Sequence, residues 1–291
     1  METEKLPKHH YVPVFYLKQW AKADGRLIEF SRPSGRVEAR PCGPRGTGYK
    51  RGLYRLHSLP EHEAEQIETR FLRQVDNVSS DALQILLGKA PSKWTPNLRS
   101  GWTRFMLGAL LRTPENIARM KYKLEDSGLQ AFDSLVKDGG DPDKALDYLI
   151  HVTEASTFNL LMKVIDNTNI GPYFNAMRWF VINTKAANRT LFTSDRPIVM
   201  TNGMSKPESH LAIPISPHHA FFACNTLQTE RQLKNIKLPA LVKEMNRHIV
   251  QRAVKYVWNR ETEQIDYVRK HMSSHAYLDR DFTESSVAKA L

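Results

Sequence analysis

The spacing of apolar residues changes along this chain, and that change limits the folds it can form. Between residues 61 and 167 apolar side chains recur every three or four positions, as in Ile67, Phe71 and Val75, which predicts amphipathic helices. After Gly171 they form short β-branched and aromatic runs separated by Asn, Gly and Pro, which predicts a mainly antiparallel sheet. The chain is therefore expected to be an α+β protein.

Two further patterns extend this prediction toward the ends of the chain. The strand-like runs 26–31 and 36–40 flank Arg32-Pro33-Ser34-Gly35, a turn-rich tetrapeptide that predicts a β-hairpin. Leu241 and Val257 bound a series of apolar residues at spacings of four, which predicts a terminal helix.

The length of 291 residues is compatible with one large domain or two ordinary ones, and either can bury a core. We expect a single integrated domain over residues 1–291. Its parts would be an N-terminal segment and hairpin at 1–60, a helical region at 61–170, and a sheet plus helix at 171–291.

The composition also bears on where the protein works. Its apolar runs are far shorter than the roughly 20 residues that span a bilayer, and its first residues are charged instead of forming an apolar signal core. Cys42 and Cys224 are its two cysteines, too few for a disulfide framework or a zinc motif. A soluble, cytoplasmic protein without a membrane partner is expected.

The net charge of +11 is unevenly distributed. Residues 18–55 carry ten Lys or Arg against three acidic residues, and residues 89–125 carry eight against two. Clustered cations attract polyanions and release counterions on binding, so nucleic acid is the expected partner. A solvated basic surface that maintains solubility is the alternative. The residues expected to contact nucleic acid are Arg51, Arg55, Arg104 and Arg112.

Two groups in the first part of the chain could carry chemistry. The adjacent His9 and His10 could bind a metal or relay protons, although on a strand only one would face a given site; alternatively they brace the next helix. Glu61, Glu65 and Glu68 follow one flank of a predicted helix and could supply metal ligands or a general base. Alternatively, they are solvated acids near a helix N-terminus.

A third candidate is Asp195, in the turn Ser194-Asp195-Arg196-Pro197 between strand-like runs. A loop on a rigid support can present a carboxylate to a metal, but Asp in a tight turn commonly hydrogen-bonds its own backbone. Ser194 lacks the Gly-x-Ser-x-Gly setting of a hydrolase nucleophile, so a serine triad has no specific support.

Several motifs together resemble those of a known family. They are the opening HHYVPVFYLKQWA, the glutamate-bearing helix near residue 61, the GWTRFMLGALLRTP segment, the FTSDRPIV turn and the later PISP. In these the chain is similar to an uncharacterised bacterial family, a domain of unknown function whose members begin with an HHYVP-type motif. The resemblance spans nearly the whole chain and implies one integrated unit. It implies no established activity or catalytic residues.

The leading hypothesis is a nucleic-acid-directed, divalent-metal-dependent nuclease that uses Mg²⁺ or Mn²⁺. A hard cation held by carboxylates and an imidazole could activate water and stabilise charge on phosphate oxygens. The alternatives are a non-enzymatic nucleic-acid-binding or regulatory module, and a protein-interaction component. The expected catalytic residues are His10, Glu61, Glu68 and Asp195, and the expected metal ligands are these four together with His9.

Overall fold

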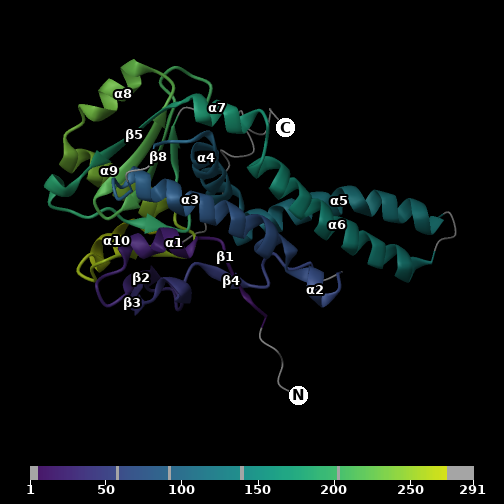
Figure 1. The fold of residues 1–291 in the computed structure, drawn as a ribbon. Coiled ribbons are helices and arrows are strands. Elements are labelled where there is room, and N and C mark those ends of the chain that lie inside the picture. The colour runs from purple at the N-terminus through teal and green to yellow at the C-terminus, as the bar shows by residue number, and fades with distance from the viewer. Residues whose placement is uncertain (1–5, 57–58, 91–92, 138–140, 202–203, 274–291) are drawn as a thin grey trace.

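The computed structural model describes residues 6–56, 59–90, 93–137, 141–201 and 204–273. It confirms the predicted α+β class: strands at the N-terminal end, helices in the centre, and antiparallel sheets and a last helix in the C-terminal part (Figure 1).

The N-terminal segment begins with strand β1 (Lys8–His10), which pairs antiparallel with β4 (Tyr49–Arg51). Between them lie the short helix α1 (Val14–Leu17), which starts after Pro13, and the predicted hairpin of β2 (Leu27–Ser31) and β3 (Glu38–Cys42). Because Pro fixes its own φ and disfavours helix at the residue before it, it sets the start of α1.

The central region is helical, as predicted, but its first helix is irregular. A short α-helix is followed by a π-helical turn before a regular helix resumes. α5 and α6 form a long hairpin that projects from the rest of the molecule (Figure 1); we call it the arm. The elements are α2 (Glu61–Ala64), the π-helical turn (Ile67–Leu72), α3 (Arg73–Leu86), α4 (Pro96–Leu111), α5 (Pro114–Lys137), α6 (Pro142–Ile165) and α7 (Ile170–Ala176).

The C-terminal part contains strands of two four-stranded sheets, with orders β5-β9-β8-β7 and β3-β2-β10-β6. Every strand pair in them is antiparallel. The second sheet therefore includes the N-terminal hairpin. The remaining elements are β5 (Arg178–Asn183), β6 (Thr193–Ser194), β7 (Val199–Thr201), β8 (His210–Ser216), β9 (His219–Cys224), α8 (Leu227–Lys234), α9 (Leu238–Arg252), β10 (Val257–Asn259) and α10 (Ile265–His271).

The helix predicted to run as far as Val257 ends earlier, at Arg252. Val257 instead begins β10, which lies between β2 and β6. The carboxylate of Asp195 accepts hydrogen bonds from the three backbone N–H groups just before β10, those of residues 254–256. A distant side chain therefore holds this backbone in a non-helical path, which the local spacing of apolar residues does not reveal.

The N-terminal segment packs on the C-terminal sheets through buried side chains. The hydroxyl of Tyr16 donates to the carbonyl of Pro214 at 2.7 Å and also binds Thr193 Oγ1 at 2.7 Å. The indole N–H of Trp20 donates to the carbonyl of Leu191 at 2.9 Å. One hydrophobic core joins side chains from these segments with those of the central helices.

Among the helices that the structure describes, none has the length and apolar character needed to cross a membrane.

Candidate active site

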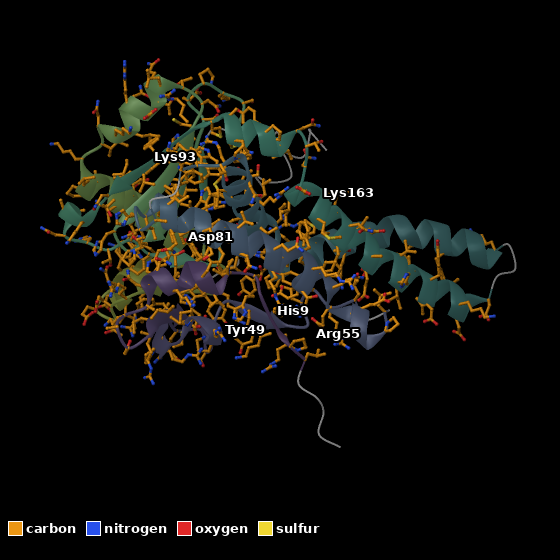
Figure 2. All side chains as sticks on the ribbon, in the orientation of Figure 1. His9, Tyr49, Arg55, Asp81, Lys93 and Lys163 are labelled. Atoms are coloured by element: carbon orange, nitrogen blue, oxygen red, sulfur yellow. The ribbon has the colours of Figure 1, made fainter. Side chains whose placement is uncertain are left out.

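The two adjacent histidines have different environments. On β1 successive side chains point to opposite sides, and His9 is 1% exposed whereas His10 is half-buried. In the view of Figure 2, His9 lies between Tyr49 and Arg55. Because of this alternation, the imidazole of His9 lies in the interior of the protein, whereas that of His10 faces a pocket described below.

His9 is fully engaged inside the protein. Its Nδ1 accepts the backbone N–H of Tyr54 at 2.8 Å, and its Nε2 contacts the carboxylate of Glu65. Because Nδ1 accepts, the proton of the neutral ring lies on Nε2 and is donated to Glu65. The ring also stacks on Tyr54, and Arg55 donates to the other oxygen of Glu65 at 3.2 Å. Burial lowers the pKa of His9, against the opposing attraction of Glu65.

His10, by contrast, keeps a nitrogen free. Its buried Nε2 has no hydrogen-bond partner among the described residues. Burial is the main cause that lowers the pKa of His10; a hydrogen bond to the Arg45 backbone opposes it, and the positive charges of Lys8, Arg112 and Arg45 add to the lowering. The imidazole is therefore neutral near pH 7, and its Nε2 can accept or donate a proton.

Glu68 is the second group with an unused atom. It lies in the π-helical turn Ile67–Leu72, a distortion that is frequent at functional sites. Its Oε2 is buried without a partner among the residues described. Burial raises the pKa of Glu68 to about 7, with Arg112 opposing and Asp76 adding to the shift. Near neutral pH this carboxyl is present in both protonation states.

Arg112 provides a buried positive charge behind these groups. Its side chain is 1% exposed, and Nη1 donates to the carboxylate of Asp76 at 3.0 Å. Its Nε and Nη2 have no hydrogen-bond partner in the described part of the chain. The hydroxyl of Tyr54 donates to the Arg112 carbonyl at 2.8 Å and so links this cation to the His9 network.

A pocket of about 630 Å³ collects these groups between β1, α1 and α3. His10, Glu68 and Asp76 line it together with four cationic side chains. It has the composition expected of an anion-binding site, with one imidazole and one carboxyl available for proton transfer. The full lining is Lys8, His10, Val14, Phe15, Lys18, Arg45, Glu68, Arg73, Asp76, Asn77 and Ser80.

The residues expected to bind a metal are not brought together by the structure as a ligand set. Among the described residues no group of three or more His, Cys, Asp or Glu could hold a metal ion. The cation that interacts with both Glu68 and Asp76 is the guanidinium of Arg112, and both nitrogens of His9 are occupied. Glu61 begins α2, but its side chain lies outside what the structure describes. Among the described side chains, the members of this set therefore do not form a ligand group for Mg²⁺ or Mn²⁺.

Asp195 has a structural environment. It is buried, and its carboxylate accepts the backbone N–H groups of Val254, Lys255 and Tyr256 at 3.0, 2.6 and 3.0 Å. Burial raises the pKa of Asp195 to about 6, while these three hydrogen bonds act in the opposite direction. The carboxylate thus fastens the chain before β10 to β6 through backbone N–H groups from a distant part of the chain, whereas the alternative interpretation expected it to bond the backbone of its own turn.

The four arginines expected to contact nucleic acid lie in different environments. Arg112 is buried and Arg55 is paired with Glu65. Arg104 donates to Asp166 at 2.6 Å, and exposed Arg51 donates to the carbonyl of Leu6 at 2.5 Å. They do not form one exposed basic surface, because Arg112 is inside the protein.

Sequence reasoning missed two components of this site, Asp76 and the cationic rim of Arg45 and Arg73. Asp76 follows Glu68 by eight positions, a spacing that returns to the same side of a helix, so a signal existed. No local pattern indicates that Arg112 reaches Asp76, since the two residues belong to different helices.

Comparison with known proteins gives one match. Residues 8–263 match the model of a family described as "Protein of unknown function (DUF4238)". No curated protein and no solved structure matches this chain.

Proposed function

This chain belongs to that family of unknown function, and we propose that it is a nucleic-acid-directed enzyme that cleaves phosphodiester bonds by acid–base catalysis. The observation that carries the proposal is a pair of unpartnered buried atoms on residues that line one pocket, His10 Nε2 and Glu68 Oε2. The buried cation of Arg112, which also has two unpartnered nitrogens, interacts with Glu68 and Asp76 from behind the pocket lining. Buried polar atoms normally have partners. A phosphate group bound in the pocket would lie near His10 and Glu68, and its negative charge would be favoured by the buried Arg112 cation behind them.

The charges around the pocket support a phosphate as the ligand. Lys8, Lys18, Arg45 and Arg73 line it, against the carboxyls of Glu68 and Asp76. Arginine suits phosphate because its N–H groups match two oxygens at once. Although the net charge of +11 is not concentrated on the four arginines expected from the sequence, the rim cations would hold neighbouring phosphates of a polyanion.

The proposed roles of His10 and Glu68 follow from their protonation states: neutral His10 can accept a proton, and protonated Glu68 can donate one. Neutral His10 would accept through Nε2 the proton of the attacking hydroxyl, from water or a ribose 2′-OH, as its oxygen forms a bond to phosphorus. Protonated Glu68 would give its proton to the oxygen that leaves as its P–O bond breaks. Arg112 would stabilise the additional negative charge on the phosphate in the transition state. His10 thus takes up one proton and Glu68 supplies one, so the two side chains together balance the proton transfers.

The test is a cleavage assay on labelled single- and double-stranded RNA and DNA, with chelator and separately with Mg²⁺ or Mn²⁺. We expect cleavage of at least one substrate with chelator present, and its loss in His10→Gln and Glu68→Gln, while both variants keep salt-sensitive binding. Glu263→Gln, at an exposed position, is the matched control and should behave as the wild type.

Two results would contradict the proposal. If the protein binds nucleic acid but cleaves none, the pocket serves a non-enzymatic binding module. If cleavage needs the metal and survives in both variants, the reaction is metal-dependent and neither His10 nor Glu68 carries it.

A further inference from the structure

The pocket that holds His10 and Glu68 continues as a cleft between α1 and α3, which lie alongside each other (Figure 1). His10 comes shortly before α1 and Glu68 shortly before α3, and both line the pocket. At the other end, Lys89, just after α3, donates to the side-chain oxygen of Gln19, in the 3₁₀ turn after α1, at 3.3 Å. The two helices therefore run in the same direction, and the cleft leads away from His10 and Glu68 along both of them. We call this part of the pocket the α1–α3 cleft.

The α1 wall of the cleft has an aromatic and apolar part. The inner side of α1 and of the turn after it carries Tyr16 and Trp20, which are buried in the core. The outer side carries Val14, Phe15 and Lys18, which line the pocket. A site for phosphate alone needs charges and hydrogen-bond donors and has no use for an aromatic ring. A partly exposed ring beside cations is instead the arrangement on which proteins stack the bases of single-stranded nucleic acids.

The α3 wall is polar along its whole length. The residues that line it are Arg73, Asp76, Asn77 and Ser80, and their spacings of three, four and seven positions place them on one face of the helix. Ser80 lies about 10 Å beyond Arg73 along the helix axis. Amide and hydroxyl side chains such as those of Asn77 and Ser80 form hydrogen bonds with the edges of bases. The charged groups are therefore concentrated toward the His10 end of the cleft, and neutral hydrogen-bonding groups lie farther along it.

We propose that the α1–α3 cleft binds an unpaired nucleotide next to the phosphate at His10, so that the substrate is a single-stranded nucleic acid. The base stacks on Phe15, its edge faces Asn77 and Ser80, and Lys18 pairs with the next phosphate. This inference rests on the proposed function, because it assigns the substrate class of the same pocket.

Two further observations favour a single strand over a duplex. The pocket volume of about 630 Å³ is within the range of roughly 300–1,000 Å³ for sites that enclose a whole small molecule, and a phosphate group alone is much smaller. In a duplex the bases are stacked and paired inside the helix. One of them could reach Phe15 only after it had been unpaired and unstacked, which costs free energy that a single strand does not have to supply.

Binding measured without cleavage tests this inference separately from the chemistry. The full-length His10→Gln variant, in chelator, is titrated into labelled single-stranded RNA or DNA and into the same strand annealed to its complement, and fluorescence anisotropy gives the Kd. At least one of the two single strands should bind about tenfold or more tightly than its duplex, which corresponds to about 1.4 kcal/mol. Equal affinity, or tighter binding of the duplexes, would overturn the inference.

Substitutions of Phe15 test the stacking contact. Phe15→Leu, in the same His10→Gln background, should weaken single-strand binding by about tenfold, whereas Phe15→Tyr keeps an aromatic face and should bind as tightly as Phe15. Thermal melts of both are needed because Phe15 also packs against Phe105, with ring centroids 5.5 Å apart. A folded Phe15→Leu variant with unchanged single-strand affinity would overturn the inference.

Asn77 gives a readout that does not involve the core, since it is exposed. Asn77→Ala should change the order of affinities among single strands made only of A, of C or of U. Asn97→Ala, an exposed asparagine on α4 that is not among the residues lining the pocket, is the matched control and should keep the order. The same order in Asn77→Ala would contradict a base at this position.

The cleavage assay separates failure of this inference from failure of the proposed function. Equal wild-type cleavage of single strands and duplexes would overturn the single-strand assignment and leave acid–base cleavage in place. A single-strand preference that depends on Phe15, without any cleavage, would support the cleft as a binding site and remove the proposed enzyme activity.

Discussion

Arg112 binds Asp76 with one of its terminal nitrogens, at 3.0 Å, and leaves Nε and Nη2 without a partner among the described residues. The two residues come from different helices, α3 and the end of α4. An unpaired donor in the interior costs free energy. The buried positive charge of Arg112 acts on Glu68 and Asp76, two residues that line the pocket, and so favours negative charge there.

The first prediction is that Arg112 contributes to both stability and anion binding. Arg112→Met should lower the free energy of unfolding by on the order of 3 kcal/mol, since it leaves Asp76 without its buried partner. Urea denaturation at pH 7 measures this. Adding Asp76→Asn to this variant should recover part of the loss, because the unpaired carboxylate is then removed. Full stability of Arg112→Met would show that the pair is unimportant.

Inorganic phosphate offers a second readout for the same arginine. Phosphate at ten times its Kd should stabilise the wild type by about 1.4 kcal/mol and should leave the Arg112→Met, Asp76→Asn double variant unchanged. Equal stabilisation of the two proteins would place the phosphate site elsewhere.

The second prediction concerns Glu68 and pH. Its pKa is raised in the folded protein to about 7, above its unfolded value near 4.3. The ionised group therefore costs stability above pH 7, and this cost disappears as the pH falls from 7 toward 4. Glu68→Gln should be more stable than the wild type at pH 8, by on the order of 2 kcal/mol, with no gain at pH 4.5. A pH-independent difference would contradict a buried, titrating Glu68.

The third prediction is that activity has an acidic optimum. Catalysis as proposed needs neutral His10, whose pKa is lowered by burial, and protonated Glu68, whose pKa is raised to about 7. The rate should therefore fall as the pH rises through 7, and should fall again on strong acidification when His10 becomes charged. Initial rates between pH 4 and 9 measure the profile. A rate that increases steadily up to pH 9 would exclude this assignment of acid and base.

The fourth prediction separates the two neighbouring histidines. His9→Ala should destabilise the fold by about 2–3 kcal/mol, because it leaves the Tyr54 N–H and the Glu65 carboxylate without their partner. His10→Gln should change stability by less than about 1 kcal/mol yet abolish turnover. Thermal melts and cleavage rates of both variants test this. The reverse pattern would mean that His9 carries the chemistry.

The fifth prediction assigns Asp195 to the fold. Asp195→Asn should lower stability by roughly 2–4 kcal/mol, because the amide cannot accept all three hydrogen bonds from residues 254–256. The surviving folded fraction should keep its specific activity. An inactive variant with wild-type stability would return Asp195 to the catalytic site.

Much of the secondary structure could be predicted because it depends on local patterns. The three- and four-residue spacing of Ile67, Phe71 and Val75 indicated a helical region, and Arg32-Pro33-Ser34-Gly35 indicated the hairpin. In both cases the structure depends on residues that are close together in the sequence: the spacing of apolar side chains for the helix, and the turn-forming residues for the hairpin. Alternation along a strand also indicated that one of His9 and His10 would face a given site.

The site depended on contacts that no local pattern contains. The sequence by itself determined the α+β class, the hairpin of β2 and β3, and the helical region that carries Glu68. Only the tertiary structure decided that Asp195 holds the backbone before β10, that Arg112 lies inside against Asp76, and that His10 and Glu68 line one pocket. The physical reason is range: a helix or turn is set by near neighbours, whereas pairing, burial and the resulting pKa shifts are set by side chains that folding brings together from distant parts of the chain.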